Sequence, residues 1–253
     1  MPAQLFRNHD ACGDIVVPIG GVEFQTINVV TNLFFVVAGR ALAVKSRRSE
    51  ARQSGVLLLA VAWFSAAYHA TSSWGGFLLD ICAMAIWVSH LVGCCQTACA
   101  GLGHGLILPR PRSPEHQGAW FLAVASVGSA CAVGAPFVAF EVFDADPVTT
   151  WNVWANSFLV LVLLVALPGL FCLAREGLLR PIVGTVAASV AFILVGVIFT
   201  QLIHVLCVPG HFTALPLHSM WHACSATSAY LMVNLVDDAL CAAAERSGGL
   251  KEN

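Results

Sequence analysis

The chain has 253 residues, of which 58% are hydrophobic and only 10% are charged, and its formal net charge is −2. Soluble globular domains carry about 25% charged residues, so this composition indicates an integral membrane protein. The near-neutral charge, without a basic tract, argues against nucleic acid as a partner. Residues 1–22 contain Asp10, Gly13 and Asp14 where a secretory signal needs an apolar core, so the first span is expected to act as its own uncleaved signal.

Hydropathy predicts an all-α membrane protein with a bundle of seven transmembrane helices, each of about 20 residues, the length that crosses roughly 30 Å of hydrocarbon. In chain order the spans are predicted at 24–44, 55–73, 77–99, 118–141, 152–173, 182–206 and 214–237. They form one domain at 24–240, between an N-terminal extramembrane segment at 1–23 and a C-terminal tail at 241–253. Turn and breaker residues separate the spans, such as Pro209 and Gly210 before the seventh.

Basic residues collect in alternate loops of this seven-span arrangement. Eleven of the 12 lie on one side of the membrane, namely Arg40, Lys45, Arg47, Arg48, Arg52, Arg110, Arg112, Arg175, Arg180, Arg246 and Lys251. The positive-inside rule therefore predicts an outside or luminal N-terminus and a cytoplasmic C-terminus. The expected location is a bacterial inner membrane, or the membrane of the endoplasmic reticulum or Golgi if the source is eukaryotic.

Two cysteines fall on the predicted outer side, where oxidation is chemically accessible. Cys12 lies in the N-terminal segment and Cys207 in the loop before the last span. A disulfide between them is one hypothesis, and two unpaired thiols is the other.

Five polar residues interrupt the apolar spans, where imidazoles and carboxylates are costly and usually functional. Ser65 and His69 are four residues apart in the second span, and His218 and His222 have the same spacing in the seventh. That spacing puts each pair on one helix face. Asp80 begins the third span, and the predicted topology brings all five to similar depth near the outer face.

Three histidines with a nearby carboxylate and hydroxyl suit a catalytic metal site with one open position. Imidazole ligands favour zinc, although ligand type alone leaves iron, copper and nickel open, and a haem-binding pair is a further alternative. A water in the open position would have its pKa lowered to roughly 7 by zinc. Asp80 would accept its proton or orient a histidine, and Ser65 would donate a hydrogen bond to an oxyanion. By contrast, His90 and His204 are expected to be hydrogen-bonding groups between helices.

Two segments carry a resemblance to a known family. FSAAYHATSSWGGFLLD, which contains Ser65, His69 and Asp80, and HSMWHACSATSAYL in the last span together resemble the alkaline ceramidases. These belong to a wider superfamily of seven-span hydrolases that includes the progestin and adiponectin receptors. The resemblance extends over essentially the whole chain in span number, orientation and motif order.

The resemblance implies a role for each motif residue. His69, His218 and His222 would be zinc ligands, Asp80 the acceptor of a proton from zinc-bound water, and Ser65 the group that stabilises the oxyanion. The implied reaction is hydrolysis of the ceramide amide to a sphingoid base and a free fatty acid. The lipid would enter sideways from the bilayer.

The family also carries a calcium site, built from acidic N-terminal residues and a glutamate before the first span. Asp10, Asp14 and Glu23 match this pattern in part. Calcium prefers six to eight oxygen ligands, and three carboxylates supply few of them. A solvated acidic N-terminus is the competing interpretation.

Two other functions compete with ceramide hydrolysis. The first is hydrolysis of another N-acyl or ester lipid on the same fold, because no residue pattern identifies the sphingoid chain. The second is a seven-helix receptor with structural zinc, against which the presence of both Ser65 and Asp80 argues. A retinal protein is not expected, because Lys45 and Lys251, the only lysines, lie outside the core of the last span.

Overall fold

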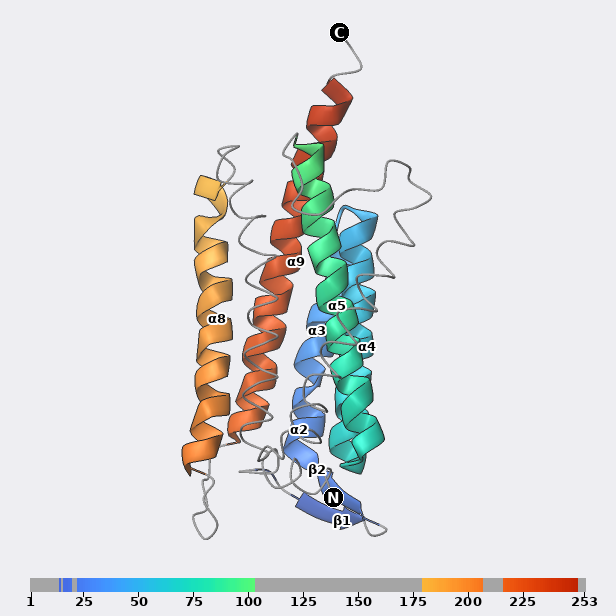
Figure 1. The fold of residues 1–253 in the computed structure, drawn as a ribbon, viewed down its shortest axis with the longest axis vertical. Helices are drawn as coiled ribbons and strands as arrows, with labels where there is room; N and C mark the ends of the chain where they lie inside the picture. Colours follow the sequence, from blue (N-terminus) through green and yellow to red (C-terminus); the bar gives the residue numbers. More distant parts are fainter. Residues whose placement is uncertain (1–13, 15, 20–21, 103–178, 207–215, 250–253) are drawn as a thin grey trace, which may run out of the picture.

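The computed structural model describes residues 14, 16–19, 22–102, 179–206 and 216–249. An antiparallel hairpin of β1 (Val16–Ile19) and β2 (Val22–Gln25) comes first. It is followed by the helices α2 (Thr26–Thr31), α3 (Leu33–Lys45), α4 (Ser49–Thr71), α5 (Trp74–Gly101), α8 (Leu179–Leu206) and α9 (Leu217–Gly249). The long helices run side by side, and the hairpin lies at one end of the bundle (Figure 1).

Three of the described helical segments are long and apolar enough to cross a membrane. They are Thr26–Lys45, Ser49–Thr71 and Gly75–Cys99, and α8 contains a shorter apolar stretch at Val183–Phe199. These helices indicate a membrane protein, as the composition predicts. The predicted fourth and fifth spans, 118–141 and 152–173, lie outside the described residues.

The helices differ from the predicted spans mainly at their ends. The first span is divided into α2 and α3 at Asn32. The backbone N–H of Asn32 donates to the carbonyl of Val29, and its side-chain Nδ2 donates to the backbone carbonyl of Asn28 at 2.9 Å. The last helix continues to Gly249, well into the predicted tail at 241–253. The hairpin strands cover the end of the predicted extramembrane segment at 1–23, for which no structure was predicted, and β2 extends into the start of the predicted first span.

The turn between α4 and α5 is held by two serines. Ser72 adopts a left-handed backbone conformation (φ 45°), and its N–H bonds to the carbonyl of Tyr68, which ends α4. The Ser73 hydroxyl accepts the N–H of Gly76 at 3.0 Å and so caps the start of α5. This tight reversal keeps the end of α4 beside the first turns of α5.

Helices α3 and α4 approach each other through two glycines. A Cβ atom on Gly55 would lie 2.5 Å from the backbone nitrogen of Ala43 and 2.7 Å from the carbonyl oxygen of Gly39. Small residues permit such close backbone approach between membrane helices. The core beside this contact is formed by α3, α4, α5 and α9, with Leu42, Leu58 and Val233 almost fully buried.

Replacement of Gly55 by alanine is expected to lower the free energy of unfolding by about 1–3 kcal/mol, because the new methyl group forces the two backbones apart. Denaturant unfolding in detergent micelles measures this change. Gly184→Ala is the matched control, since no atom lies within 4 Å of its Cβ position and alanine favours the helix. Equal stability of the two variants would contradict the close contact.

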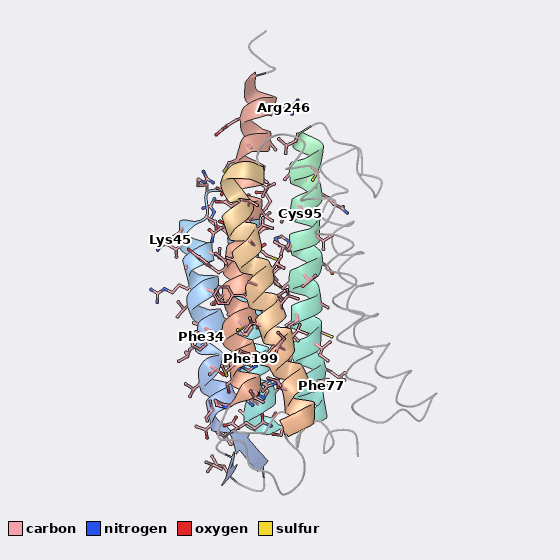
Figure 2. The ribbon with its side chains drawn as sticks, turned by 90° about the vertical axis from the view of Figure 1, so that its left-hand side faces the viewer. Phe34, Lys45, Phe77, Cys95, Phe199 and Arg246 are labelled. Atoms are coloured by element: carbon pink, nitrogen blue, oxygen red, sulfur yellow. The ribbon has the colours of Figure 1, made fainter. Side chains whose placement is uncertain are left out.

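Asp237 organises the end of the bundle opposite the hairpin. Its buried carboxylate accepts the backbone N–H groups of Arg47 at 3.0 Å and Arg48 at 2.8 Å, so α9 holds the loop that leads into α4. Arg47 also pairs with Asp238. Lys45 and Arg246 lie toward this same end, whereas Phe77 lies toward the other (Figure 2).

Helix α8 is joined to α9 by a buried serine pair and a close contact. The hydroxyls of Ser189 and Ser228 lie 2.9 Å apart, and each also donates to the backbone carbonyl of the other residue. About two turns further along the contact, Gly196 leaves space for the ring of Trp221, since a Cβ there would lie 2.7 Å from Cε3. The glycine thereby lets α8 pack against a residue that lines the candidate site.

Candidate metal centre

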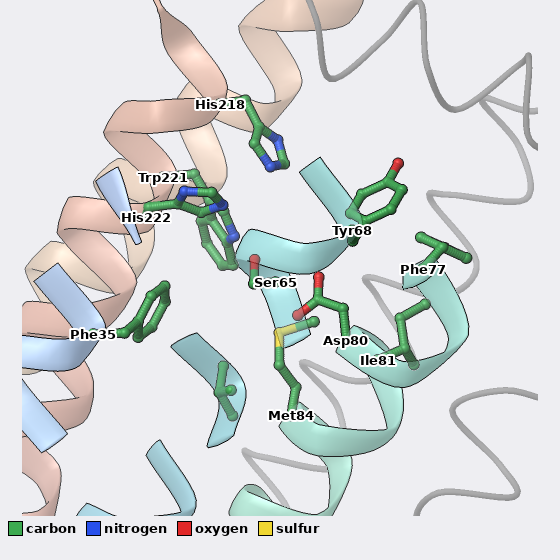
Figure 3. A pocket seen from close by; sticks show the side chains of 11 residues that line it. Phe35, Ser65, Tyr68, Phe77, Asp80, Ile81, Met84, His218, Trp221 and His222 are labelled. Carbon is green, nitrogen blue, oxygen red and sulfur yellow. The ribbon is translucent and has the colours of Figure 1, made fainter. Parts of the chain in front are cut away.

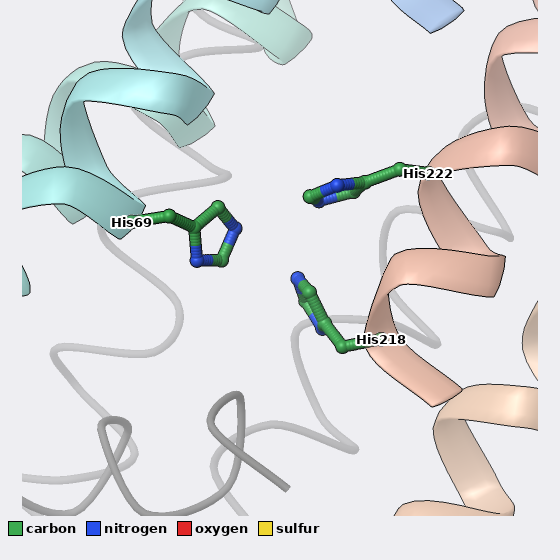
Figure 4. Close-up of side chains that lie close together, drawn as sticks. All are labelled: His69, His218 and His222. Atoms are coloured by element: carbon green, nitrogen blue, oxygen red, sulfur yellow. The ribbon is translucent and has the colours of Figure 1, made fainter. Parts of the chain in front are cut away.

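Three histidine rings meet at the hairpin end of the bundle (Figure 4). His69 comes from the last turn of α4, and His218 and His222 come from the first two turns of α9. The ring centroid of His69 lies 4.9 Å from that of His218 and 5.1 Å from that of His222. The centroids of His218 and His222 are 4.8 Å apart. All three residues are buried. The i, i+4 spacing on α9 therefore presents both rings to α4, as the sequence predicts.

The histidine cluster fits a metal ion. One ring nitrogen from each residue lies within 4.8 Å of the others, and the three rings converge from two helices. Tetrahedral ligands lie about 2.0–2.1 Å from zinc, so the three nitrogens would move closer together to bind one ion. Three neutral nitrogens leave one tetrahedral position open, the arrangement typical of catalytic rather than structural metal sites.

Ser65 and Asp80 line the same cavity as His218 and His222 (Figure 3). Ser65 lies one turn before His69 on α4, and Asp80 lies in the second turn of α5, beyond the serine-capped reversal. Both are buried, with Asp80 only 8% exposed. Burial of an ionised carboxylate is costly unless positive charge or hydrogen-bond donors lie close to it, and a metal held by the histidines would supply positive charge.

The other walls of this cavity are mostly apolar. They are formed by Phe35, Val61, Tyr68, Phe77, Ile81, Met84 and Trp221. The cavity volume is about 30 Å³, enough for one or two water molecules. The polar side chains on this small, mostly apolar space include those of Ser65, Asp80, His218 and His222.

Two polar residues of the first span contact the histidines. Gln25 ends β2, and its Oε1 lies 2.7 Å from Nδ1 of His69. Thr31 ends α2, and its Oγ1 lies 3.0 Å from Nδ1 of His222. The sequence analysis missed both, although the signal that found the histidines applies to them: Gln25, Asn28 and Thr31 are polar residues in an apolar span.

Of the residues predicted to bind calcium or to form a disulfide, the structure describes the side chain of Asp14. Asp14 accepts the backbone N–H groups of Ile27 at 2.7 Å and Asn28 at 2.9 Å, and so caps α2 with both carboxylate oxygens. Asp10 and the side chain of Glu23, the other calcium candidates, lie outside the described residues. Cys12 and Cys207 also lie outside them.

The two histidines assigned to helix contacts differ in what the structure describes. His90 Nε2 lies 3.0 Å from the backbone carbonyl of Glu50, so α5 hydrogen-bonds to the first turn of α4. This confirms the predicted role of His90 as a hydrogen-bonding group between helices. The side chain of His204 lies outside the described part of α8.

No protein-family model matches the chain, and no curated protein has a matching sequence.

Proposed function

We propose that this protein is a zinc-dependent intramembrane amidase that hydrolyses ceramide to a sphingoid base and a free fatty acid. The observation that carries the proposal is a buried group of three histidines, two of which, His218 and His222, line one cavity together with a carboxylate and a hydroxyl. A metal that only joins helices needs neither a proton acceptor nor an oxyanion donor beside it. The choice of the ceramide amide follows from the resemblance of the motif segments to alkaline ceramidases.

His69, His218 and His222 would hold the metal, and neutral imidazole ligands favour zinc among the common ions. When bound, zinc makes water nucleophilic near neutral pH and withdraws electron density from a carbonyl oxygen. An amide needs both effects because its carbonyl carbon is a weak electrophile.

Asp80 and Ser65 have separate roles in the proposed reaction. Asp80 accepts a proton from the attacking water as the carbon–oxygen bond forms, and returns it to the amide nitrogen as the carbon–nitrogen bond breaks. The Ser65 hydroxyl donates a hydrogen bond to the carbonyl oxygen while negative charge develops on it. The products are a fatty acid and the free amine of the sphingoid base.

The proposal includes a membrane setting of seven spans, with the N-terminus outside and the lipid entering sideways from the bilayer. Two observations support it. The cavity walls are mostly apolar, which suits a lipid substrate. Lys45 and Arg246 lie toward the end of the bundle away from the histidines, as expected if that end faces the cytoplasm (Figure 2).

The substrate assignment is tested with purified protein in lipid nanodiscs. Ceramide, an N-acylethanolamine and a diacylglycerol that carry the same acyl chain are offered separately, and released products are quantified by mass spectrometry. We expect equimolar sphingoid base and fatty acid from ceramide at the highest rate. Fatty-acid release from the diacylglycerol alone would make an ester lipid, rather than ceramide, the substrate. A zinc-loaded protein that cleaves none of the three lipids would contradict the proposal that it is an enzyme.

A further inference from the structure

Two of the three histidines in the cluster have their Nδ1 atoms against polar side chains from one short segment. Gln25 and Thr31 are six residues apart, yet they reach different helices, His69 on α4 and His222 on α9. The distances, 2.7 Å and 3.0 Å, are those of hydrogen bonds. The direction of each bond decides which ring nitrogen carries the proton.

The Thr31 hydroxyl has one proton, with which it donates a hydrogen bond to the helix backbone. Its Oγ1 lies 3.0 Å from the carbonyl oxygen of Ile27 and 3.1 Å from that of Asn28, the usual back-bonding of threonine within a helix. When the hydroxyl donates to these carbonyls, its oxygen has lone pairs toward His222 and accepts a hydrogen bond from Nδ1. In this arrangement the proton of that imidazole lies on Nδ1.

The bond to His69 has its direction set by a relay of buried side chains. Ser219 on α9 donates to Oδ1 of Asn28, and Nδ2 of Asn28 donates to Oε1 of Gln25 at 3.0 Å. Gln25 and Asn28 are each only 1% exposed. The same Gln25 oxygen faces His69, so Nδ1 of His69 also donates.

A neutral imidazole carries one proton, and with it on Nδ1 the lone pair lies on Nε2. We propose that Gln25 and Thr31 are positioning residues that hold His69 and His222 in this form, with both Nε2 atoms presented to the metal. The inference rests on the proposed metal site and extends it to the first span. Partners of this kind fix both the tautomer and the ring orientation of metal-bound histidines.

The relay also ties the residues before the first span to the metal centre. Asp14 holds the N–H groups of Ile27 and Asn28, and thereby fixes the backbone from which Asn28 reaches Gln25. Ser219 lies next to His218 in sequence and contacts the same Asn28. The first span, α4 and α9 thus meet in one hydrogen-bonded group around the histidines.

The test measures zinc affinity of the full-length protein in detergent, by competition with a chromophoric chelator after metal removal. Gln25→Leu and Thr31→Val each remove the acceptor while nearly preserving side-chain size. We expect each to weaken zinc binding by about 10- to 100-fold and to change the visible spectrum of the cobalt-substituted protein. Gln25→Glu and Thr31→Ser retain an acceptor oxygen, and the zinc affinity of both should be close to that of the unmodified protein.

Gln53→Leu and Thr227→Val are the matched controls. Gln53 is exposed on α4, and the Thr227 hydroxyl donates to the carbonyl of Ala223 within α9. Both controls should bind zinc normally. The inference is overturned if Gln25→Leu and Thr31→Val bind zinc as tightly as the unmodified protein, if the acceptor-retaining variants fail to restore affinity, or if the unmodified protein binds no zinc.

These measurements separate the inference from the proposed reaction, since zinc affinity is read without substrate. Loss of affinity in both variants of a protein that leaves ceramide intact would support the positioning roles and contradict the amidase. If the unmodified protein hydrolyses ceramide and both variants keep its zinc affinity, the amidase is supported and the positioning roles are contradicted.

Discussion

Replacement of His218 by alanine is expected to remove zinc from the protein and to reduce ceramide hydrolysis to the background rate. His218 supplies one of three nitrogens that converge within 4.8 Å, and two imidazoles from different helices form a much weaker site. Zinc content, measured by inductively coupled plasma mass spectrometry, should fall from about one zinc per chain to near zero. Fatty-acid release from a fluorescent ceramide should fall with it.

His90 offers the matched control for this experiment. It also lies within the helical bundle, but its ring contacts the backbone carbonyl of Glu50 rather than the other histidines. His90→Ala should keep its zinc and most of its activity, with some loss of stability because the bond between α5 and α4 is removed. Full zinc content and full turnover in His218→Ala would contradict the metal centre.

Replacement of Asp80 by asparagine is expected to leave zinc bound while turnover falls on the order of 10²–10⁴-fold. Asparagine has the same shape as aspartate but does not accept a proton, and general base catalysis is typically worth that much. The change should appear in kcat for ceramide, measured alongside zinc content on the same preparation. A loss of zinc together with turnover would instead make Asp80 a residue that supports the ligands.

Asp238→Asn is the control for the Asp80 variant. Its side chain is 57% exposed and pairs with Arg47 at the far end of the bundle, so turnover should stay near the unmodified value. Undiminished turnover in Asp80→Asn would remove this carboxylate from the reaction.

The sequence predicted the candidate site better than its surroundings. A histidine in an apolar span is costly enough to be noticed wherever it occurs, and i, i+4 spacing places two of them on one face without knowledge of the fold. The reversal after His69 could also be predicted, because Ser72, Ser73 and two glycines interrupt the apolar sequence there. These local signals were sufficient to bring together His69, His218 and His222.

The contacts that the sequence analysis missed depend on residues far apart in the chain. Asp237 holds the loop before α4 from a position 189 residues beyond Arg48, and the pairing of Thr31 with His222 joins residues 191 positions apart. Each partner alone is an ordinary polar residue in a helix. Their roles follow only from the packing of α9 against the first two spans, which apolar periodicity does not specify.

The hairpin and the break at Asn32 were missed for a different reason. Hydropathy treats 24–44 as one span, because the polar side chains that begin it are few among many apolar residues. In the structure the span begins with Gln25 at the end of a strand, and a short helix precedes the break. Asn28 and Asn32 hydrogen-bond to nearby groups at this point, and a hydropathy window does not register such bonds.

Removal and return of zinc in the purified protein is the most direct test of the proposed amidase. The protein is stripped with a chelator, and ceramide hydrolysis is followed while zinc is added back in fractions of one equivalent per chain. We predict no hydrolysis by the stripped protein and a linear recovery that ends at about one zinc per chain. Hydrolysis that persists without metal, or zinc-loaded protein that leaves ceramide intact, would contradict the account.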